Sequence, residues 1–451
     1  MSPDRAGADA ASPTARLERA LAGRYPSEDH MQPDLERIRD LLDLLGSPQK
    51  SYQSIHITGT NGKTSTARMA DSLLRAFGVR VGRYTSPHLQ SVTERICIDG
   101  APVSPELMAA AYDELAPYVE LVDSRHPQPM TFFEVLTGLA FAVFADAPVD
   151  AAVVEVGLGG AWDATNTIAA PVAVVMPISL DHQKFLGDTI ADIATEKSGI
   201  VHPGAKLVLA AQPLEAAEVL LRRAVEVGAE VAREGVEFGV VSREIAVGGQ
   251  RLSLQGLAGR YDDILLPLHG GHQAHNAAAA LAAVEAFFGA GPDRQLDIET
   301  VRAGFAAAES PGRLEVVRRG PTVLLDAAHN PAGAAALALA LAESFTFDRL
   351  IGVLAVLNDK DARGIVDALA DTLDLLVVTA STSPRALPAR ELASIATEVF
   401  GPDRVAIAES LPDAIETAVQ LADTGELGGG GVVITGSVVT VGEARTLLRA
   451  R

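Results

Sequence analysis

The sequence predicts an α/β protein that folds as two doubly wound lobes. Short apolar runs, which are typical of buried parallel strands, alternate with stretches of helical periodicity along most of the 451 residues. One alternation begins with a glycine-rich turn between a strand and a helix at residues 55–69. A second restarts at Leu314, directly after the Pro-Gly pair at residues 311–312. We therefore expect two open, mostly parallel sheets, of which the second is the smaller.

The composition is that of a soluble α/β enzyme, with 48% apolar residues and 40 glycines. A net charge of −21 argues against nucleic-acid and anionic-membrane partners, because both attract clustered Lys and Arg. No apolar run reaches the ~18 residues that a membrane-spanning helix needs, and residues 1–13 resemble a loose tail rather than a signal peptide. The single cysteine, Cys97, cannot form an internal disulfide, so we expect a core thiol and a cytoplasmic setting.

Residues 55–69 have the features of a phosphate-binding loop. Gly59 and Gly62 let backbone N–H groups turn toward phosphate oxygens, and Lys63 adds a full positive charge at the start of a helix. A hydroxyl at Thr64 or Ser65 can hold Mg²⁺. Because the first glycine comes later than in the common pattern, the loop is a shortened Thr-Gly-Thr-Asn-Gly-Lys-Thr variant. The first lobe is thus predicted to be P-loop ATPase-like, with a glycine-rich turn and an exposed lysine as the simpler alternative.

The other elements of the first lobe follow from periodicity and from turn residues. Helices are predicted at 15–21, 33–45, 64–77, 105–122, 131–145, 190–199, 213–226 and 276–288, and strands at 55–58, 79–84, 151–156 and 172–178. Residues 203–268 alternate short strands with one helix, so we expect the far edge of the same sheet followed by a β-rich excursion.

Polar residues lie where several of these predicted strands end. Ser86 follows one strand, Glu155 ends another, and His182 follows a third. A carboxylate at the end of an apolar strand is costly to bury without a cation, so these three are candidates for one hard metal ion. Lys197 by itself fits an ordinary positive charge at a helix C-terminus. Asn276, in the first turn of a helix, fits a cap and a nucleotide contact equally well.

The second lobe is predicted to be Rossmann-like. Strands are expected at 323–326, 350–356, 374–379, 404–407 and 432–435, and helices at 331–342, 361–371, 388–400 and 411–423. Residues 428–431, all glycine, are expected to be a flexible segment before the last strand. The expected organisation is a flexible tail at 1–13, a first domain at 14–309, a linker at 310–314 and a second domain at 315–451.

An ordered set of motifs resembles the folylpolyglutamate synthase and dihydrofolate synthase family, relatives of the peptidoglycan Mur ligases. The resemblance implies that residues 14–309 are an ATP-binding and folate-binding domain and that residues 315–451 are a ligase domain. The motifs lie at residues 59–63, 85–89, 93–96, 133–134, 155–160, 163–166, 181–182, 196–200, 311–313 and 326–331. The resemblance covers roughly residues 33–445. It implies a ligase that uses ATP to join a dihydropteroate or reduced folate carboxylate to L-glutamate through an acyl phosphate. It also implies Mg²⁺, with two ions expected.

The resemblance assigns roles to individual residues. It implies nucleotide contacts for Asn61, Gly62, Lys63, Thr64, Ser65, Asn276, Arg313 and Asp326. It implies metal ligands at Thr64, Ser86, Glu155, His182 and Lys197, with Lys197 carbamylated, and catalytic roles for Lys63, Lys197 and His329. It implies a pteridine side lined by Thr131, Phe132, Phe133, Glu134, Trp162, Asp163 and Ala164.

Two positions depart from the family pattern on the pteridine side, where Ala161 stands for a frequent arginine and Trp162 for a leucine. Thr64 replaces a frequent glycine, as in the Mur ligases.

A UDP-muramyl ligase is one alternative, although the ~55 residues before the loop are short for a UDP-binding domain. A nucleotide-binding switch without ligase chemistry is another. By analogy we expect a bifunctional, monomeric enzyme; the chain length and linkage of its product do not follow from the sequence.

Overall fold

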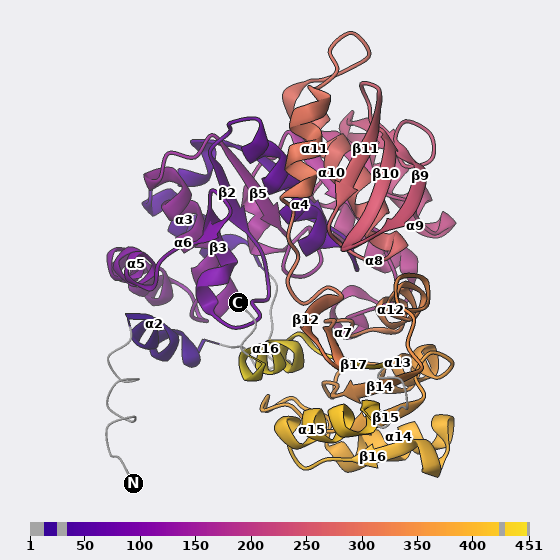
Figure 1. Ribbon diagram of the computed structural model, residues 1–451. Coiled ribbons are helices and arrows are strands. Elements are labelled where there is room, and N and C mark those ends of the chain that lie inside the picture. Colours follow the sequence, from indigo (N-terminus) through magenta and orange to yellow (C-terminus); the bar gives the residue numbers. More distant parts are fainter. Residues whose placement is uncertain (1–12, 25–33, 424–428, 449–451) are drawn as a thin grey trace.

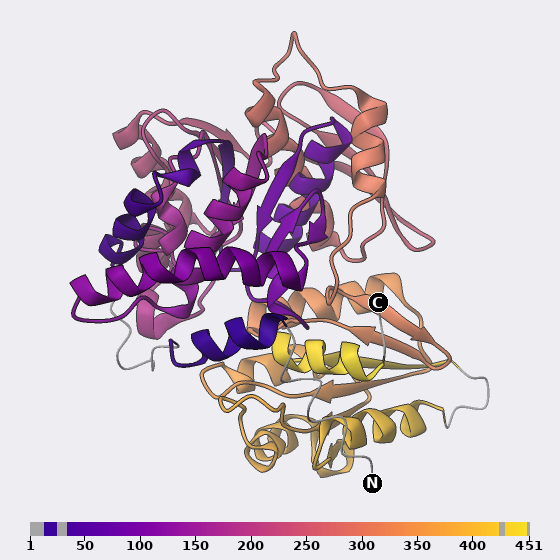
Figure 2. The same cartoon turned by 90° about the vertical axis from the view of Figure 1, so that its left-hand side faces the viewer.

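The computed structural model describes residues 13–24, 34–423 and 429–448 of the chain. It has two α/β lobes, each built around an open sheet (Figure 1). The second lobe, in orange and yellow, lies below the first in Figure 1 and again in Figure 2, after a quarter turn. The predicted fold class is therefore confirmed. The predicted tail at 1–13 lies outside the described residues except for Pro13, which begins helix α2 (Pro13–Ala22).

The first lobe contains an eight-stranded sheet in the order β4-β3-β2-β5-β1-β6-β7-β8. Its strands are β1 (Gln53–Thr58), β2 (Val81–Tyr84), β3 (Ile96–Ile98), β4 (Ala101–Pro102), β5 (Ala151–Glu155), β6 (Val172–Val175), β7 (Lys206–Leu209) and β8 (Glu230–Arg233). The strands from β2 to β8 in that order pair in parallel, and β3 and β4 add an antiparallel edge. The carboxyl ends of β1, β2, β5 and β6 thus lie side by side, and polar loops follow all four.

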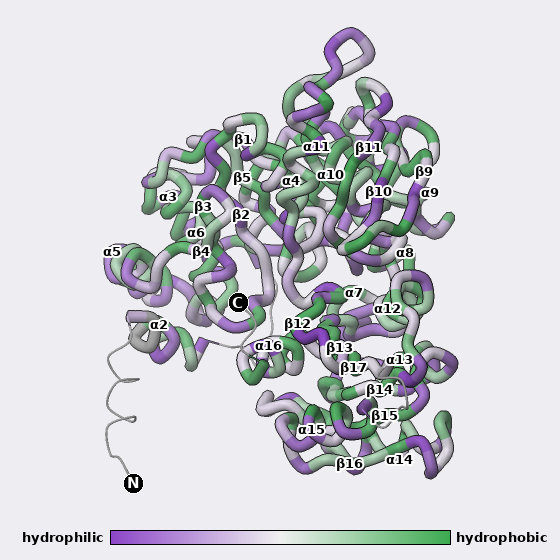
Figure 3. Tube along the Cα trace, in the orientation of Figure 1, coloured by the Kyte–Doolittle hydropathy of each residue, from purple (hydrophilic) through white to green (hydrophobic). Residues whose placement is uncertain are grey.

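Helices cover both faces of this sheet. They are α3 (Glu36–Leu44), α4 (Lys63–Ala76), α5 (Pro105–Arg125), α6 (Phe132–Asp146), α7 (Gln183–Leu186), α8 (Ile190–Ser198), α9 (Leu214–Val227), α10 (Gly271–Phe288) and α11 (Ile298–Ala306). Because side chains alternate along a strand, Ile55 and Ile57 pack against α4 and α10, whereas Ala152 and Val154 pack against α6 on the other face. In Figure 3 the middle of the first lobe, around β1, β5, α4 and α10, contains many green, hydrophobic stretches of chain.

The β-rich excursion is confirmed as a separate three-stranded antiparallel sheet. It consists of β9 (Gly239–Ala246), β10 (Gly249–Gln255) and β11 (Arg260–Leu266). One face of it joins the same apolar core as α4 and α10. The predicted continuation of the large sheet through β7 and β8 is also confirmed.

The second lobe has a six-stranded sheet in the order β12-β13-β17-β14-β15-β16. Its elements are β12 (Glu315–Arg319), β13 (Thr322–Leu325), α12 (Pro331–Ser344), β14 (Arg349–Leu354), α13 (Ala362–Leu369), β15 (Leu375–Val378), α14 (Ala389–Phe400), β16 (Val405–Ile407), α15 (Leu411–Ala422), β17 (Gly430–Thr435) and α16 (Val438–Leu447). Only β12 runs antiparallel within this sheet. Helix α16, which the sequence reading did not predict, follows the central strand and lies at the boundary between the lobes in Figure 1.

The prediction that residues 428–431 are a flexible segment is wrong for Gly430 and Gly431. Both lie buried in β17 and pair in parallel with β13 and β14. A Cβ on Gly430 would lie 1.9 Å from the Ala422 carbonyl oxygen, and one on Gly431 would lie 2.6 Å from the Phe347 ring. Close packing against the end of α15 at Gly430 and against the Phe347 ring at Gly431 therefore requires these glycines. Gly428 lies outside the described residues.

A buried ion pair joins α4 to the sheet. Arg83 Nη1 of β2 lies 2.7 Å from Asp71 Oδ2 of α4, and both side chains are almost completely buried. Arg83 also donates to Cys97 Sγ on β3 at 3.0 Å, which places the single cysteine in the core as predicted.

We expect Asp71→Ala to lower the free energy of unfolding by about 3–5 kcal/mol, because it leaves the Arg83 guanidinium buried without its carboxylate. Urea unfolding followed by far-UV circular dichroism measures the change. Asp367→Ala, which breaks the solvent-exposed pair between Arg363 and Asp367, is the matched control and should cost less than about 1 kcal/mol. Equal losses in the two variants would show that the buried pair has no special role.

Candidate active site

A cavity of about 430 Å³ lies at the carboxyl ends of the first sheet, where the second lobe faces the first. Its size is in the range typical of small-molecule sites. Every residue that the sequence analysis assigned to ATP, Mg²⁺ or catalysis lines it. They are Asn61, Gly62, Lys63, Thr64, Ser65, Ser86, Glu155, His182, Lys197, Asn276, Arg313, Asp326 and His329.

The loop between β1 and α4 brings backbone close to the cavity. Gly59 and Gly62 have φ angles of +140° and +89°, which side chains rarely tolerate. A Cβ on Gly62 would lie 2.5 Å from Asn276 Oδ1, so the turn also packs directly on α10. The Lys63 ammonium donates to the carbonyl oxygens of Gly59 and Thr60 at 2.9 and 3.1 Å. The loop therefore holds its cation at the N-terminus of α4, where an anion is favoured.

The two hydroxyls after Lys63 have different surroundings. Thr64 Oγ1 donates to Glu155 Oε1 at 2.8 Å, and the Ser86 backbone N–H donates to Glu155 Oε2 at 3.3 Å. Ser65 Oγ instead lies 3.0 Å from Ser310 Oγ and accepts from Gln273 Nε2 at 3.4 Å. The sequence left the choice between the hydroxyls open, and the structure places Thr64 beside the candidate metal carboxylate.

The group around Glu155 fits a hard divalent cation. Glu155 is almost fully buried, and burial raises its pKa although the nearby Lys63 opposes this. A buried carboxylate next to the hydroxyl-bearing residues Thr64 and Ser86 supplies the oxygen ligands that Mg²⁺ prefers. Within the described residues no group of three or more His, Cys, Asp and Glu side chains has metal-binding geometry, so waters or ATP oxygens would have to complete the coordination.

Lys197 lies at the end of α8 and is 4% exposed. Burial, followed by repulsion from Lys63, lowers the pKa of its amine to about 7. An exposed lysine at a helix C-terminus, the simpler reading of the sequence, would remain fully charged at that pH. The buried amine is instead neutral for a large fraction of the time, which is the form that reacts as a nucleophile.

A charged cluster joins the two lobes beside the cavity. Lys360 of the second lobe donates to Asp181 Oδ1 at 2.7 Å and lies 3.2 Å from His182 Nε2 in the first lobe. Burial would raise the pKa of Asp181, but the charges at His182, Lys360 and His329 lower it well below its usual value. Asp181 therefore stays ionised and attracts the second lobe.

An amide pair lies next to this cluster. Asn330 Nδ2 donates to Asn61 Oδ1 at 3.1 Å, and Asn61 Nδ2 donates to Asn330 Oδ1 at 3.3 Å. Asn330 also caps α12 by accepting from the Gly333 backbone N–H at 2.7 Å. The start of the second lobe's first helix is thus tied to the phosphate-binding loop.

The remaining nucleotide candidates lie on the walls of the cavity. Asn276 is buried, and its Nδ2 donates to Gln273 Oε1 at 3.1 Å rather than capping the helix backbone. Asp326 accepts from the backbone N–H groups of Leu314 and Ala328, each at 2.9 Å. Burial raises the pKa of Asp326, and Arg313 opposes the rise. The second lobe thus adds a carboxylate and a cation to the same cavity.

The structure does not bring the predicted pteridine-side residues into this cavity, whose lining includes none of Thr131, Phe132, Phe133, Glu134, Trp162, Asp163 and Ala164. Thr131 and Glu134 form the predicted capping box of α6, and Glu134 pairs with Arg37 at 3.0 Å. Phe133 lies against Tyr84 with ring centroids 5.9 Å apart. Asp163 caps the turn that begins at Ala164. Their contact with a substrate stays a prediction.

The sequence reading missed three charged residues of the site. Asp181 and Lys360 stood in polar segments after predicted strands, but nothing in the sequence indicated that they pair across the lobes. Arg68, one turn after Thr64 on α4, also lines the cavity. Its spacing of four residues from Thr64 on a predicted helix was the available signal.

Comparisons with known proteins place the chain beside one group of enzymes. The Mur ligase middle domain matches residues 57–284, and the glutamate ligase domain of Mur ligases matches residues 312–438. The dihydrofolate synthase/folylpolyglutamate synthase of Mycobacterium tuberculosis is 57% identical, over 96% of this chain and 93% of its own length. A crystal structure of that organism's folylpolyglutamate synthase with ADP and AMPPCP superposes with a TM-score of 0.92, at 57% identity over 97% and 98% of the two chains. A complex of a folylpolyglutamate synthase with AMPPCP and folate gives a TM-score of 0.83 at 30% identity, over 96% and 99% of the chains.

The structure places the Thr64 hydroxyl, rather than that of Ser65, beside Glu155. Mg²⁺ titration of ATP binding tests whether Thr64 is the metal ligand. We expect Thr64→Val to raise the half-saturating Mg²⁺ concentration about fivefold or more, because it removes the oxygen that contacts Glu155. Ser65→Ala is the matched control and should leave that concentration within about twofold. A larger effect of Ser65→Ala would contradict the assignment.

Proposed function

Because the chain belongs to the Mur ligase family, and within it to the dihydrofolate synthase/folylpolyglutamate synthases, we propose how its two lobes carry out the activity of that group. The enzyme is an ATP-dependent ligase that joins folate or dihydropteroate carboxylates to glutamate. We further propose that one site serves both acceptors, that L-glutamate is the amine, and that the enzyme acts as a monomer. The main support is the convergence of all the nucleotide, metal and catalytic candidates on one cavity.

The chemistry demands activation of a carboxylate, because oxide is a poor leaving group. The γ-phosphoryl group of ATP is transferred to the acceptor carboxylate, which gives an acyl phosphate and ADP. The amine of glutamate then attacks the acyl carbon, loses a proton, and phosphate leaves with the bonding electrons. Both steps depend mainly on positioning and on neutralising phosphate charge.

The residues of the cavity fit these demands. The backbone N–H groups of the loop and the Lys63 ammonium would bind the β- and γ-phosphates, while Asp326 and Arg313 would bind the rest of the nucleotide from the second lobe. Mg²⁺, held by Thr64, Ser86 and Glu155, would neutralise phosphate charge. His329 lies 3.8 Å from Asp181 at the point where the lobes meet, so its position near the phosphates depends on lobe contact.

The pteridine side is proposed by resemblance. Residues 131–134 and 162–164 match the segments that line it in the family, and they lie outside the cavity described above. We also propose that residues 310–314 link a domain at 14–309 to a domain at 315–451. Movement about that link would open and close the cavity.

Carbamylation of Lys197 is proposed on its burial and its lowered pKa. A carbamate would turn a repulsive ammonium next to Lys63 into an anion, which together with His182 suits a second Mg²⁺. Because the amine must be neutral to react with CO₂, carbamylation should increase as the pH rises through about 7.

In the parts of the chain that the structure describes, no helix is both long enough and apolar enough to span a bilayer.

Phosphate release by the purified protein tests the function. With ATP, Mg²⁺ and glutamate, we expect dihydropteroate and tetrahydrofolate each to stimulate release, and mass spectrometry to show products one glutamate heavier. A UDP-muramyl peptide is the comparison acceptor, and stimulation by that compound alone would identify a muramyl ligase. Nucleotide hydrolysis unaffected by every acceptor would indicate a switch.

Substitution of Lys197 tests the carbamate. We expect Lys197→Ala to lower kcat by at least about a hundredfold and short carboxylates such as formate or acetate to restore part of it. In wild-type protein with ¹³C-bicarbonate, a carbamate carbon signal should grow between pH 6 and 8 and be absent from the variant. Full activity of Lys197→Ala would exclude this role.

A further inference from the structure

Arg68 is a cavity-lining cation that the roles described so far do not use. It lies on α4, one turn beyond Thr64, and lines the same cavity as Ser86, Leu89 and Glu94. Within the described ranges of the chain, its guanidinium has no hydrogen-bond or ion-pair partner. In a protein with a net charge of −21, a partly buried arginine without a carboxylate is unusual.

Three carboxylates of the first lobe make their contacts with groups other than Arg68. Asp71, on the same helix, pairs with Arg83 at 2.7 Å and with Arg75 at 3.3 Å. Glu94 accepts the backbone N–H groups of Leu89, Gln90 and Ser91 at 2.8 to 3.0 Å.

Glu155 likewise bonds to Thr64 and to the Ser86 backbone. Among the described residues, none of the five guanidinium N–H groups of Arg68 donates to another protein group, so they can bind a ligand.

The charges around Arg68 favour an anion. Burial, followed by repulsion from Arg83, lowers the pKa of Arg68 to about 10, although Cys97 and Glu94 oppose the shift, and Arg68 stays positively charged at neutral pH. Arg313, which lines the same cavity, adds further positive potential. A carboxylate suits a guanidinium because two parallel N–H···O bonds can form.

The position of Arg68 indicates which anion of the reaction it binds: a phosphate of ATP or a carboxylate of the acceptor. Phosphates belong at the N-terminus of α4, with Lys63, whereas Arg68 lies five residues, about 7.5 Å of helix rise, farther along. A folate that already carries glutamate has two carboxyl carbons on that residue, roughly 5 Å and four single bonds apart, and we take the γ-carboxyl as the one that reacts. Dihydropteroate has a single carboxylate, the one that reacts, and nothing to place at Arg68.

We propose that Arg68 binds the α-carboxylate of the terminal glutamate of a folate acceptor and so distinguishes glutamylated folates from dihydropteroate. The proposal rests on the proposed function. It makes Arg68 a specificity-determining residue of the elongation reaction. After each addition, the new terminal glutamate would bind Arg68 through its own α-carboxylate.

Steady-state kinetics with two acceptors test this role. Arg68→Met keeps the length of the side chain but removes the charge and the donors. It should raise the KM for tetrahydrofolate about tenfold or more and leave the KM for dihydropteroate within about twofold. Arg68→Lys, which keeps a charge without the planar fork, should fall between wild type and Arg68→Met for tetrahydrofolate.

The matched control is Arg75→Met on the same helix, because Arg75 pairs with Asp71 and does not line the cavity. This variant should leave both KM values unchanged. A tetrahydrofolate whose α-carboxyl group is amidated provides a second comparison. It should be a weak acceptor for wild type, and Arg68→Met should not weaken it further. Unchanged melting temperature and ATP affinity would show that Arg68→Met is folded.

Four results would overturn the proposal. Two concern the acceptors used by Arg68→Met: equal KM increases for tetrahydrofolate and dihydropteroate, or an unchanged KM for tetrahydrofolate. The others are an increase in the KM for glutamate or ATP instead, and an equal loss on the amidated acceptor and on tetrahydrofolate. Failure of the wild-type enzyme with every acceptor would instead refute the proposed function. If wild type uses tetrahydrofolate but not dihydropteroate, the comparison of tetrahydrofolate with its amidated form still tests whether Arg68 binds the α-carboxylate.

Discussion

The organisation of this molecule depends on placing charged groups at the buried carboxyl edge of a parallel sheet. Glu155 ends a strand of apolar neighbours and is held by the Thr64 hydroxyl and the Ser86 backbone, while Lys63 lies in the adjacent loop. Such charges are costly to bury alone and strongly interacting once buried. The chain as a whole carries a charge of −21 and would repel an anionic nucleotide. The cations in this cavity offset that repulsion and favour nucleotide binding there.

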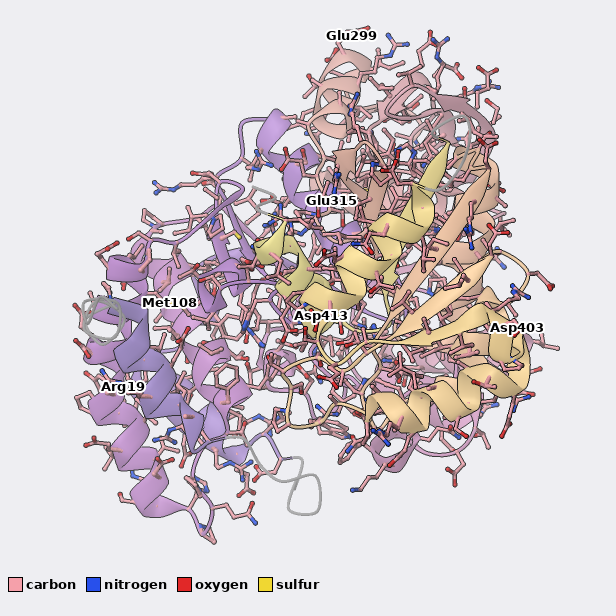
Figure 4. The ribbon with its side chains drawn as sticks, turned by 60° about the horizontal axis from the view of Figure 1, so that its bottom comes forward. Arg19, Met108, Glu299, Glu315, Asp403 and Asp413 are labelled. Atoms are coloured by element: carbon pink, nitrogen blue, oxygen red, sulfur yellow. The ribbon has the colours of Figure 1, made fainter. Side chains whose placement is uncertain are left out.

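The second lobe completes this electrostatic arrangement. Lys360 reaches across to Asp181, and the reciprocal Asn61 and Asn330 amide bonds join the phosphate loop to the start of α12. A further contact between the lobes lies nearer the C-terminus, where Gln90 Nε2 donates to Thr446 Oγ1 at 3.0 Å, beside the Arg445–Glu315 pair within the second lobe. Glu315 is labelled in Figure 4, in which Arg19 and Met108 mark the first lobe and Asp403 and Asp413 the second. Polar contacts of this kind are compatible with lobes that separate and close again, as ligation in a sheltered cavity requires.

Sequence reasoning was most successful where a local pattern carries its own physical reason. The glycine-lysine loop, the strand-end positions of Ser86, Glu155 and His182, and the capping box of Thr131 and Glu134 all lie in the predicted elements. It was less successful where packing decides. Gly430 and Gly431 resembled a flexible tract, but the neighbouring Ala422 carbonyl and Phe347 ring make them parts of a central strand. Helix α16 carries too weak an amphipathic pattern to be separated from the strand before it.

The sequence by itself determined the fold class, the order of the elements and the edge of the sheet at which polar residues gather, because periodicity and turn chemistry are local properties of a chain. Only the tertiary structure decided which groups meet. It paired Thr64 rather than Ser65 with Glu155, lowered the pKa of Lys197 by burial, joined Lys360 to Asp181, and gave Arg68 no hydrogen-bond or ion-pair partner among the described residues. Solvent exclusion and contacts between residues far apart in the sequence set these properties, and no local pattern encodes them.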